Sequence, residues 1–146
     1  MKKTYIILFI LLNSSLSVSQ LTDSINFKDN NGLKEGLWKF YYDSGEIEQE
    51  AHYKDDKLEG LWRYFYESGN TKAEGNHVNN KQDGLWRYFY ESGILSEETF
   101  FKNDNPNGLT KLYDESGNLE AEGNYVNNKQ DGLWRYFYES GNLESE

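Results

Sequence analysis

The chain has 146 residues, of which 36% are hydrophobic and 16% aromatic, and its formal net charge is −10. This acidic balance disfavours nucleic acid and anionic membrane surfaces as partners, because both would repel the protein. The chain contains no cysteine, which excludes a disulfide framework. Aromatic rings take much of the place that aliphatic side chains usually have in a core, and this composition favours β-strands.

Residues 1–19 are predicted to be a secretory signal peptide. Lys2 and Lys3 precede an apolar run at residues 5–12, and small residues at 17–19 mark a cleavage site before Gln20. A transmembrane anchor is disfavoured, because eight apolar residues are far fewer than the roughly 20 that cross a bilayer. Removing both lysines leaves 13 basic and 25 acidic residues, a net charge of about −12. We therefore expect export to the periplasm, the cell envelope or the extracellular medium.

Residues 20–35 are interpreted as an N-terminal cap or a degenerate repeat. Phe27-Lys28-Asp29 resembles Tyr53-Lys54-Asp55 further along the chain, but the spacing to the next Gly-Leu pair is longer. Terminal units of repeat proteins are often atypical, because they close an open end.

Residues 36–146 form a repeat array with a period of 24 residues, divided into four full units and a partial fifth. Two markers set this period. Gly-Leu pairs begin at residues 36, 60, 84, 108 and 132, and Ser-Gly pairs at residues 44, 68, 92, 116 and 140. Residues 73–93 and 121–141 differ only at His77 and Tyr125, which indicates duplication of a pair of units.

Each unit reads as a β-hairpin. Residues 61–66 and 71–78 are the predicted strands of one unit, and the Glu-Ser-Gly-Asn turn between them suits a glycine in the left-handed conformation. Residues 79–84 read as a second turn, whose glycine opens the next unit. No apolar spacing of three and four residues persists, so the sequence favours strands over helices.

Strand alternation divides the first run of each unit between two faces. One face carries tryptophan and tyrosine columns, and the other carries leucine, basic and further aromatic columns. Because both faces are partly apolar, we expect the sheet to curl or to be covered. The tryptophan face supplies the candidate binding residues, which are Trp38, Trp62, Tyr64, Trp86, Tyr88, Trp134 and Tyr136. The same rings could equally form the core, since hairpin stacks have little else to bury.

The repeat resembles the bacterial variant of the MORN repeat. The resemblance rests on the unit Gly-Leu-Trp-Arg-Tyr-Phe-Tyr-Glu-Ser-Gly and on the return to glycine after Asn-Asn-Lys, and it covers residues 36–146. The fourth unit departs from the pattern at Thr110, Leu112 and Asp114. The resemblance implies an elongated single sheet of stacked antiparallel β-hairpins that serves as a scaffold for protein or lipid contact. It also implies an antitoxin component of a toxin–antitoxin system as an alternative.

No motif for catalysis or cofactor binding is found, so we predict that the protein is not an enzyme and has no cofactor. The carboxylates recur in equivalent positions, whereas an acid–base pair needs two different environments. His52 and His77 do not share a column, which disfavours a metal site. Residues 103–108 only faintly resemble a calcium loop, because Asn103 stands where an aspartate normally leads.

The sequence favours two functions. Tyr, Trp and Arg are the residue types that anchor protein interfaces, which predicts a protein-interaction scaffold with a protein partner. Exposed rings also stack on sugars, so a cell-wall or glycan-binding module is the alternative.

Overall fold

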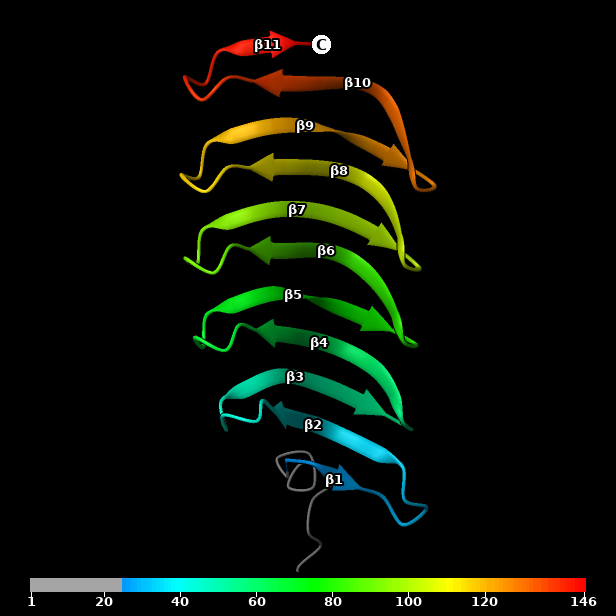
Figure 1. The fold of residues 1–146 in the computed structure, drawn as a ribbon. Coiled ribbons are helices and arrows are strands. Elements are labelled where there is room, and N and C mark those ends of the chain that lie inside the picture. Colours follow the sequence, from blue (N-terminus) through cyan, green and yellow to red (C-terminus); the bar gives the residue numbers. More distant parts are fainter. Residues whose placement is uncertain (1–24) are drawn as a thin grey trace, which may run out of the picture.

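The computed structural model describes residues 25–146, which form one antiparallel sheet of 11 strands (Figure 1). The strands are β1 (Phe27–Lys28), β2 (Lys34–Tyr41), β3 (Ile47–Lys54), β4 (Lys57–Phe65), β5 (Thr71–Val78), β6 (Lys81–Phe89), β7 (Leu95–Lys102), β8 (Asn105–Tyr113), β9 (Leu119–Val126), β10 (Lys129–Phe137) and β11 (Leu143–Ser145). They lie in the sheet in chain order, so each pairs with its neighbours in sequence. This confirms the predicted all-β stack of hairpins.

Two of the sequence predictions concern residues outside 25–146, one of them wholly and the other in part. The predicted signal peptide, residues 1–19, lies outside the described residues, as does the beginning of the predicted cap. Within residues 25–146, no helix is long and apolar enough to cross a membrane.

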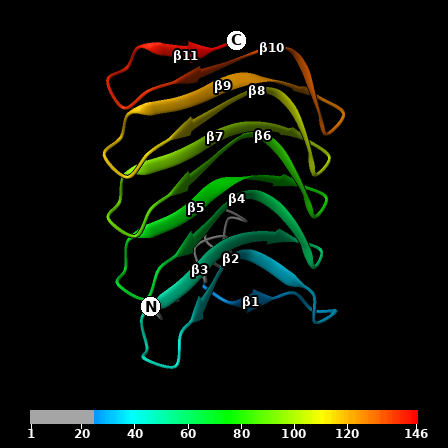
Figure 2. The ribbon, with the colours of Figure 1, turned by 45° about the horizontal axis from the view of Figure 1, so that its top comes forward.

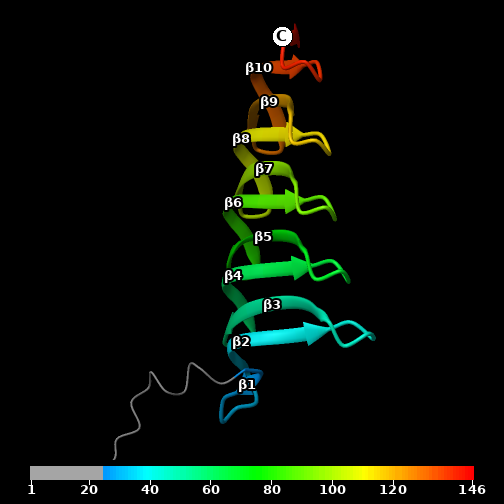
Figure 3. The same ribbon diagram turned by 90° about the vertical axis from the view of Figure 1, so that its left-hand side faces the viewer.

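The sheet is a single layer with an arched cross-section (Figure 2). The hairpins stack along one long axis (Figure 3), with the longer turns on one side and the shorter turns on the other (Figure 1). The expected curling of the sheet is thus observed. The arch lets a single layer shelter side chains on one face, which a flat sheet of this kind could not do.

The two kinds of turn have different geometry. Gly69 closes the longer turn with a φ of 87°, and its N–H donates to the Tyr66 carbonyl over 2.9 Å, as expected for a left-handed glycine. The shorter turn consists only of Asn79 and Asn80, whose φ angles are 51° and 66°. Two successive positive φ angles define a type I′ hairpin, which asparagine and aspartate tolerate. The equivalent pairs are Asp55-Asp56, Asn103-Asp104 and Asn127-Asn128.

The shorter turns also connect successive units. Asn80 donates its N–H to the Leu58 carbonyl over 3.0 Å, and its Oδ1 accepts the Leu58 N–H over 2.6 Å. The same pair of bonds joins Asp56 to Lys34 and Asp104 to Gln82. On the other side of the stack, the Tyr66 hydroxyl donates to the Phe89 carbonyl of the next unit over 2.7 Å. Each hairpin is therefore tied to the next by side-chain bonds as well as by the strand ladder.

The turn predicted at residues 79–84 is too long, because only Asn79 and Asn80 form the turn and Gly84 lies inside β6. The equivalent Gly60 in β4 has a φ of 100° and forms a bulge. Ala51 pairs with Trp62 and Tyr53 with Leu58, so three residues of β4 face the single residue His52 of β3. A bulge bends its strand and sharpens the local twist, and a glycine accepts the required φ. The repeated glycine therefore shapes the arch.

The core lies on the face that carries the tryptophans, which we call the aromatic face. Its buried side chains are those of Ala51, Ala73, Trp86, Thr99, Thr110, Ala121 and Trp134. Alternating large rings and very small side chains fill this face, because each ring lies over a neighbouring strand. The opposite face is more exposed, and its leucine column is accessible at Leu109 and Leu133.

Candidate functional site

The seven predicted binding residues all lie on the aromatic face of β2, β4, β6 and β10, but their exposure differs. Trp86 and Trp134 are 1% and 8% exposed, so both belong to the core. Tyr136 is the most accessible, with 39% of its surface exposed. The remaining four are half-buried, and these are Trp38, Trp62, Tyr64 and Tyr88.

Trp86 is buried because Gly75 on the adjacent strand has no side chain. A Cβ atom at Gly75 would lie 2.3 Å from Cδ2 of Trp86, so the indole rests directly on the glycine backbone. The indole N–H donates to the Asn76 carbonyl over 3.1 Å, which satisfies its one polar atom. The same arrangement recurs at Trp134 with Gly123 and Asn124.

A compensating pair of small residues lies where the third and fourth units meet. Thr110 replaces the tryptophan, and Thr99 replaces the glycine that would lie beneath it. Both threonines are buried, and their Oγ1 atoms share a hydrogen bond of 2.9 Å. The departure from the repeat pattern is therefore a matched exchange of one packing solution for another.

A hollow of about 480 Å³ opens on the aromatic face between β4 and β6. Its floor is Ala73 of β5, which pairs in register with Tyr64 on one side and Tyr88 on the other. Trp62 and Trp86 close one end, with ring centroids 5.6 Å apart. The hollow thus brings together four of the seven predicted residues. Its other lining residues are Gln49, Leu58, Lys72, His77 and Gln82.

His77 stands in the wall of the hollow, between the two indoles. Its ring meets Trp86 edge-on at 5.0 Å and Trp62 edge-on at 6.0 Å. Nδ1 is buried without a hydrogen-bond partner, and burial lowers the pKa of the imidazole. A neutral ring that carries its proton on Nε2 avoids a buried unpaired N–H donor, so His77 contributes no charge at neutral pH. In the sequence, His77 stood out only as the one difference between the duplicated segments 73–93 and 121–141.

The tyrosine walls are also neutral. A hydrogen bond with the Tyr42 hydroxyl, followed by burial and the nearby Glu48, raises the pKa of Tyr64 to about 12. Burial raises the pKa of Tyr88 as well. The nearest cation is Lys72, whose Nζ lies 5.2 Å from the centre of the Tyr64 ring. The hollow therefore presents flat, neutral, largely apolar aromatic walls, and Lys72 is the one lysine among residues 25–146 that lines it.

The neighbouring units do not repeat the lining of this hollow, for two different reasons. In the first unit, Lys34 covers the rings, since its Nζ lies 4.6 Å from the centre of Tyr53 and 4.9 Å from that of Trp38. In the fourth unit, Thr110 and Leu112 replace the rings of one wall. The hollow is therefore a local specialisation of the array.

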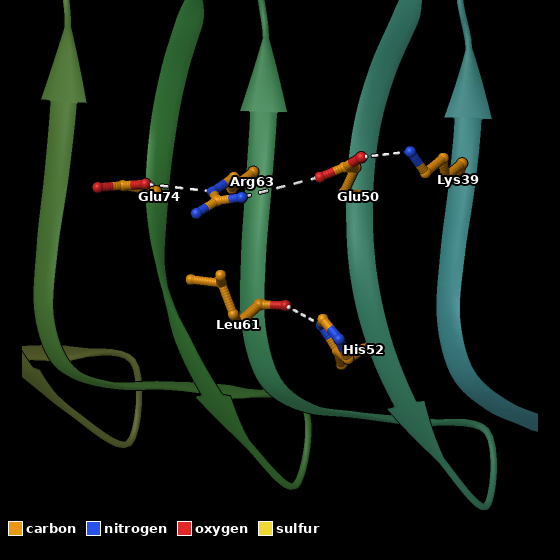
Figure 4. Close-up of polar contacts among 6 residues, drawn as sticks. All are labelled: Lys39, Glu50, His52, Leu61, Arg63 and Glu74. Atoms are coloured by element: carbon orange, nitrogen blue, oxygen red, sulfur yellow. Dashed lines mark hydrogen bonds and ion pairs between the residues drawn. The ribbon is translucent and has the colours of Figure 1, made fainter. Parts of the chain in front are cut away.

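The opposite face carries a ladder of ion pairs across successive strands (Figure 4). Glu50 lies 2.7 Å from Lys39 and 3.9 Å from Arg63, and Glu74 lies 3.3 Å from Arg63. The ladder continues through Arg87, which reaches Glu74 and Glu98. Sequence reasoning found the basic column but missed these glutamates. Their signal was the 24-residue spacing of Glu50, Glu74, Glu98, Glu122 and Glu146.

The remaining candidate sites have structural roles. His52 lies on the ladder face, where its Nδ1 is 3.0 Å from the Leu61 carbonyl oxygen (Figure 4). Asn103 and Asp104, from the segment that faintly resembled a calcium loop, form a type I′ turn, and Asp104 accepts the Gln82 N–H over 2.7 Å. Within residues 25–146, no three His, Cys, Asp or Glu side chains are grouped to hold a metal ion.

The comparisons with known proteins point to one repeat family. The family model described as the MORN repeat variant matches residues 34–55, 58–79, 82–103, 106–127 and 130–146, which together make up more than half of the chain. No curated protein matches the chain. Each matched segment begins within the first two residues of an even-numbered strand, and the first four end at a type I′ turn, so the match follows the hairpins of the sheet.

Proposed function

The chain belongs to the MORN repeat variant family, and we propose that it is a non-enzymatic protein-interaction scaffold at the cell envelope or outside the cell. Repeats of this family are generally non-catalytic. The observation that supports the proposal best is the hollow between β4 and β6, where tyrosine and tryptophan walls surround the small floor of Ala73. Aromatic anchors that fill or form such hollows contribute most of the energy of many protein interfaces.

The electrostatics support a protein rather than an anionic polymer as partner. The net charge of the whole chain is −10, and the described carboxylates line the turns and both faces of the sheet. Nucleic acid and anionic lipid would be repelled at physiological ionic strength. A partner with neutral and basic side chains would be attracted, and its association would accelerate at low salt.

The test is cross-linking of the protein in the bacterial envelope, followed by mass spectrometry of the linked partner. Tyr64→Leu should abolish capture, because it removes one wall of the hollow. Leucine is already accommodated at the equivalent Leu112, so the fold should persist. Tyr136→Leu, in the same column but outside the hollow, is the matched control and should capture the partner normally. Equal capture by both variants would contradict the proposal.

Export is tested on the same material. The mature protein should begin at Gln20 and should be found in the periplasmic, envelope or extracellular fraction. Recovery of the uncleaved chain in the cytoplasm would contradict this part of the proposal.

Glycan binding is a second candidate, favoured by the amides of Gln49 and Gln82 beside the rings of the hollow. Flat rings with neighbouring amides provide both stacking and hydrogen bonds to hydroxyl groups. Titration of the protein with neutral wall glycans would change tryptophan fluorescence if this function is correct, since two indoles lie at the hollow. Unchanged fluorescence together with partner capture would support the scaffold instead.

A further inference from the structure

We propose that the hollow binds a proline-rich segment of the partner in the polyproline II conformation, and that this segment runs along the stack of hairpins, across the strands. The inference rests on the proposed scaffold function and specifies the chemistry of its partner. It is based on one row of residues, the spacing of that row and an unpaired carboxylate beside the hollow.

The row crosses the aromatic face at right angles to the strands. Successive register pairs connect Phe40, Gln49, Tyr64, Ala73, Tyr88, Glu97, Leu112, Ala121 and Tyr136. Paired residues of antiparallel strands point to the same side of the sheet, so these side chains share one face. Within the row, the positions between the larger residues are filled by Gln49 and Glu97 but left open at Ala73 and Ala121.

The open position at Ala73 has room for one small ring. Tyr64 and Tyr88 are two strands apart, a distance of about 9.6 Å at the usual strand spacing. A saturated ring needs contacts of about 3.5 to 4 Å on each side, or a wall separation of about 7 to 8 Å, so this spacing is sufficient. Ala73 is too short to occupy that space. A proline ring is uncharged and rigid, and aromatic-lined grooves bind such segments because little conformational entropy is lost.

The period of the stack matches that of the polyproline II helix. This helix has three residues per turn and rises about 3.1 Å per residue, so it repeats every 9.3 Å or so. One hairpin unit advances about 9.6 Å along the stack. If a proline of the segment lies over Ala73, the residue three positions further along the segment lies over Glu97. The residue six positions further along lies over Ala121, the second small position in the row.

Glu97 predicts a basic residue in the partner. Its carboxylate accepts a hydrogen bond from Thr99 over 2.7 Å, and no lysine or arginine pairs with it among the described residues. The glutamates of the opposite face, in contrast, pair with the basic ladder. The expected motif is thus a proline with a lysine or arginine three positions before or after it in the partner.

The probe is an acetylated, amidated nonapeptide of eight prolines with a central lysine, titrated into the full chain by calorimetry and by tryptophan fluorescence. The central lysine has a proline three residues away on each side, so either chain direction can be read. The same peptide with a central glutamate should bind about two- to five-fold more weakly, which is the range expected for an exposed charge pair. Glu97→Gln should remove this preference and leave the affinity for the glutamate peptide unchanged or higher.

Ala73→Gln is the decisive variant. It fills the open position as Gln49 already fills the equivalent position between Phe40 and Tyr64, so the sheet can accommodate it. Binding of the lysine peptide should fall at least ten-fold, while circular dichroism and the melting temperature remain close to those of the wild type. Equal binding by Ala73→Gln and the wild type would overturn the inference.

Two further outcomes separate this inference from the scaffold function. If the peptide fails to bind the wild type at millimolar concentration while Tyr64→Leu still loses the cross-linked partner, the proline inference fails and the scaffold stands. If chitotetraose binds in an Ala73-dependent manner and the peptide does not bind, the hollow is a saccharide site. That result would overturn both the proline inference and the scaffold function.

Discussion

At the scale of single residues, the contact between Gly75 and Trp86 determines where the core lies. A Cβ atom at residue 75 would overlap the indole, and Trp86 has no exposed position to move to without losing its hydrogen bond to Asn76. Gly75→Ala should therefore destabilise the protein by about 1 to 3 kcal/mol, the usual cost of overpacking. Urea denaturation monitored by circular dichroism measures this change.

The junction of the third and fourth units supplies the control for that prediction. The double substitution Gly75→Thr with Trp86→Thr reproduces the buried pair Thr99 and Thr110. The double variant should lose less stability than the two single variants lose in sum. The coupling free energy between the two positions should be about 1 kcal/mol or more. Additivity of the two single substitutions would show that the contact is not the cause.

His77 makes stability depend on pH. Burial lowers the pKa of the folded imidazole below the 6.5 of an unperturbed one, and the nearby Asp104 only partly opposes this. Below about pH 6.5 the unfolded chain therefore binds a proton that the folded chain resists. The stability that the neutral His77 imidazole contributes is fully present above that pH and is lost as the pH falls toward the pKa of the folded state. The melting temperature should consequently be lower at pH 5.5 than at pH 7.5.

Substitution within the repeat isolates this effect. His77→Tyr introduces the residue that the duplicated segment carries at Tyr125, and it should reduce the difference in melting temperature between the two pH values. His52→Asn introduces the asparagine that the same column carries at Asn76 and Asn124, and it leaves His77 in place. An undiminished difference in the His77→Tyr protein would refute the assignment.

At the scale of the elements, the type I′ turns connect neighbouring hairpins with unequal strength. Asn80 accepts the Leu58 N–H over 2.6 Å, whereas the equivalent Asn128 faces Pro106, which has no N–H. Asn80→Ala should therefore be about 0.5 to 1.5 kcal/mol more destabilising than Asn128→Ala, which is the net value of one hydrogen bond. Both residues have φ near 65°, so backbone strain is common to both.

Chemical denaturation of the two alanine variants, fitted with a common m-value, gives the comparison. The variant Pro106→Gln supplies the missing donor, as at Gln82, and in that background Asn128→Ala should become as costly as Asn80→Ala. If the two alanine substitutions are equal in both backgrounds, the bond between the turns does not contribute.

At the scale of the whole molecule, the ion-pair ladder runs across successive strands from β2 to β7. Glu74 contacts Arg63 at 3.3 Å and Arg87 at 3.8 Å, and its side chain is 27% exposed. Partly exposed pairs contribute little individually, but a central member of a network loses two partners at once. Glu74→Gln should destabilise the protein by about 0.5 to 1 kcal/mol at low salt, and by much less in 1 M NaCl, where screening extends over about 3 Å.

Glu122→Gln is the matched comparison, because Glu122 pairs only with Arg135 among the described residues, at 3.5 Å. At low salt, Glu122→Gln should therefore lower the stability less than Glu74→Gln does. Thermal melts at 20 mM and 1 M NaCl test both variants. A salt-independent effect of Glu74→Gln would point to packing of the side chain instead of charge.

The sequence by itself determined the repeat, the strand content and the parity of each strand. A fixed period of 24 residues and alternation along each run are local properties, so they specify stacked hairpins and place the tryptophans on one face. The second strand of each unit was predicted with the observed limits at residues 71–78. The first strand was predicted too short, because a glycine with positive φ reads as a turn and here forms a bulge within a strand.

Only the tertiary structure decided which rings are core and which form a site. Equivalent tryptophans have the same sequence signal, yet Trp86 is buried over Gly75 while Trp62 lies over Ala51 and stays half-exposed. The hollow likewise depends on Ala73 standing between two tyrosines from different units. Such contacts arise between neighbouring strands, and they are fixed by register and side-chain size across the sheet, which no single repeat contains.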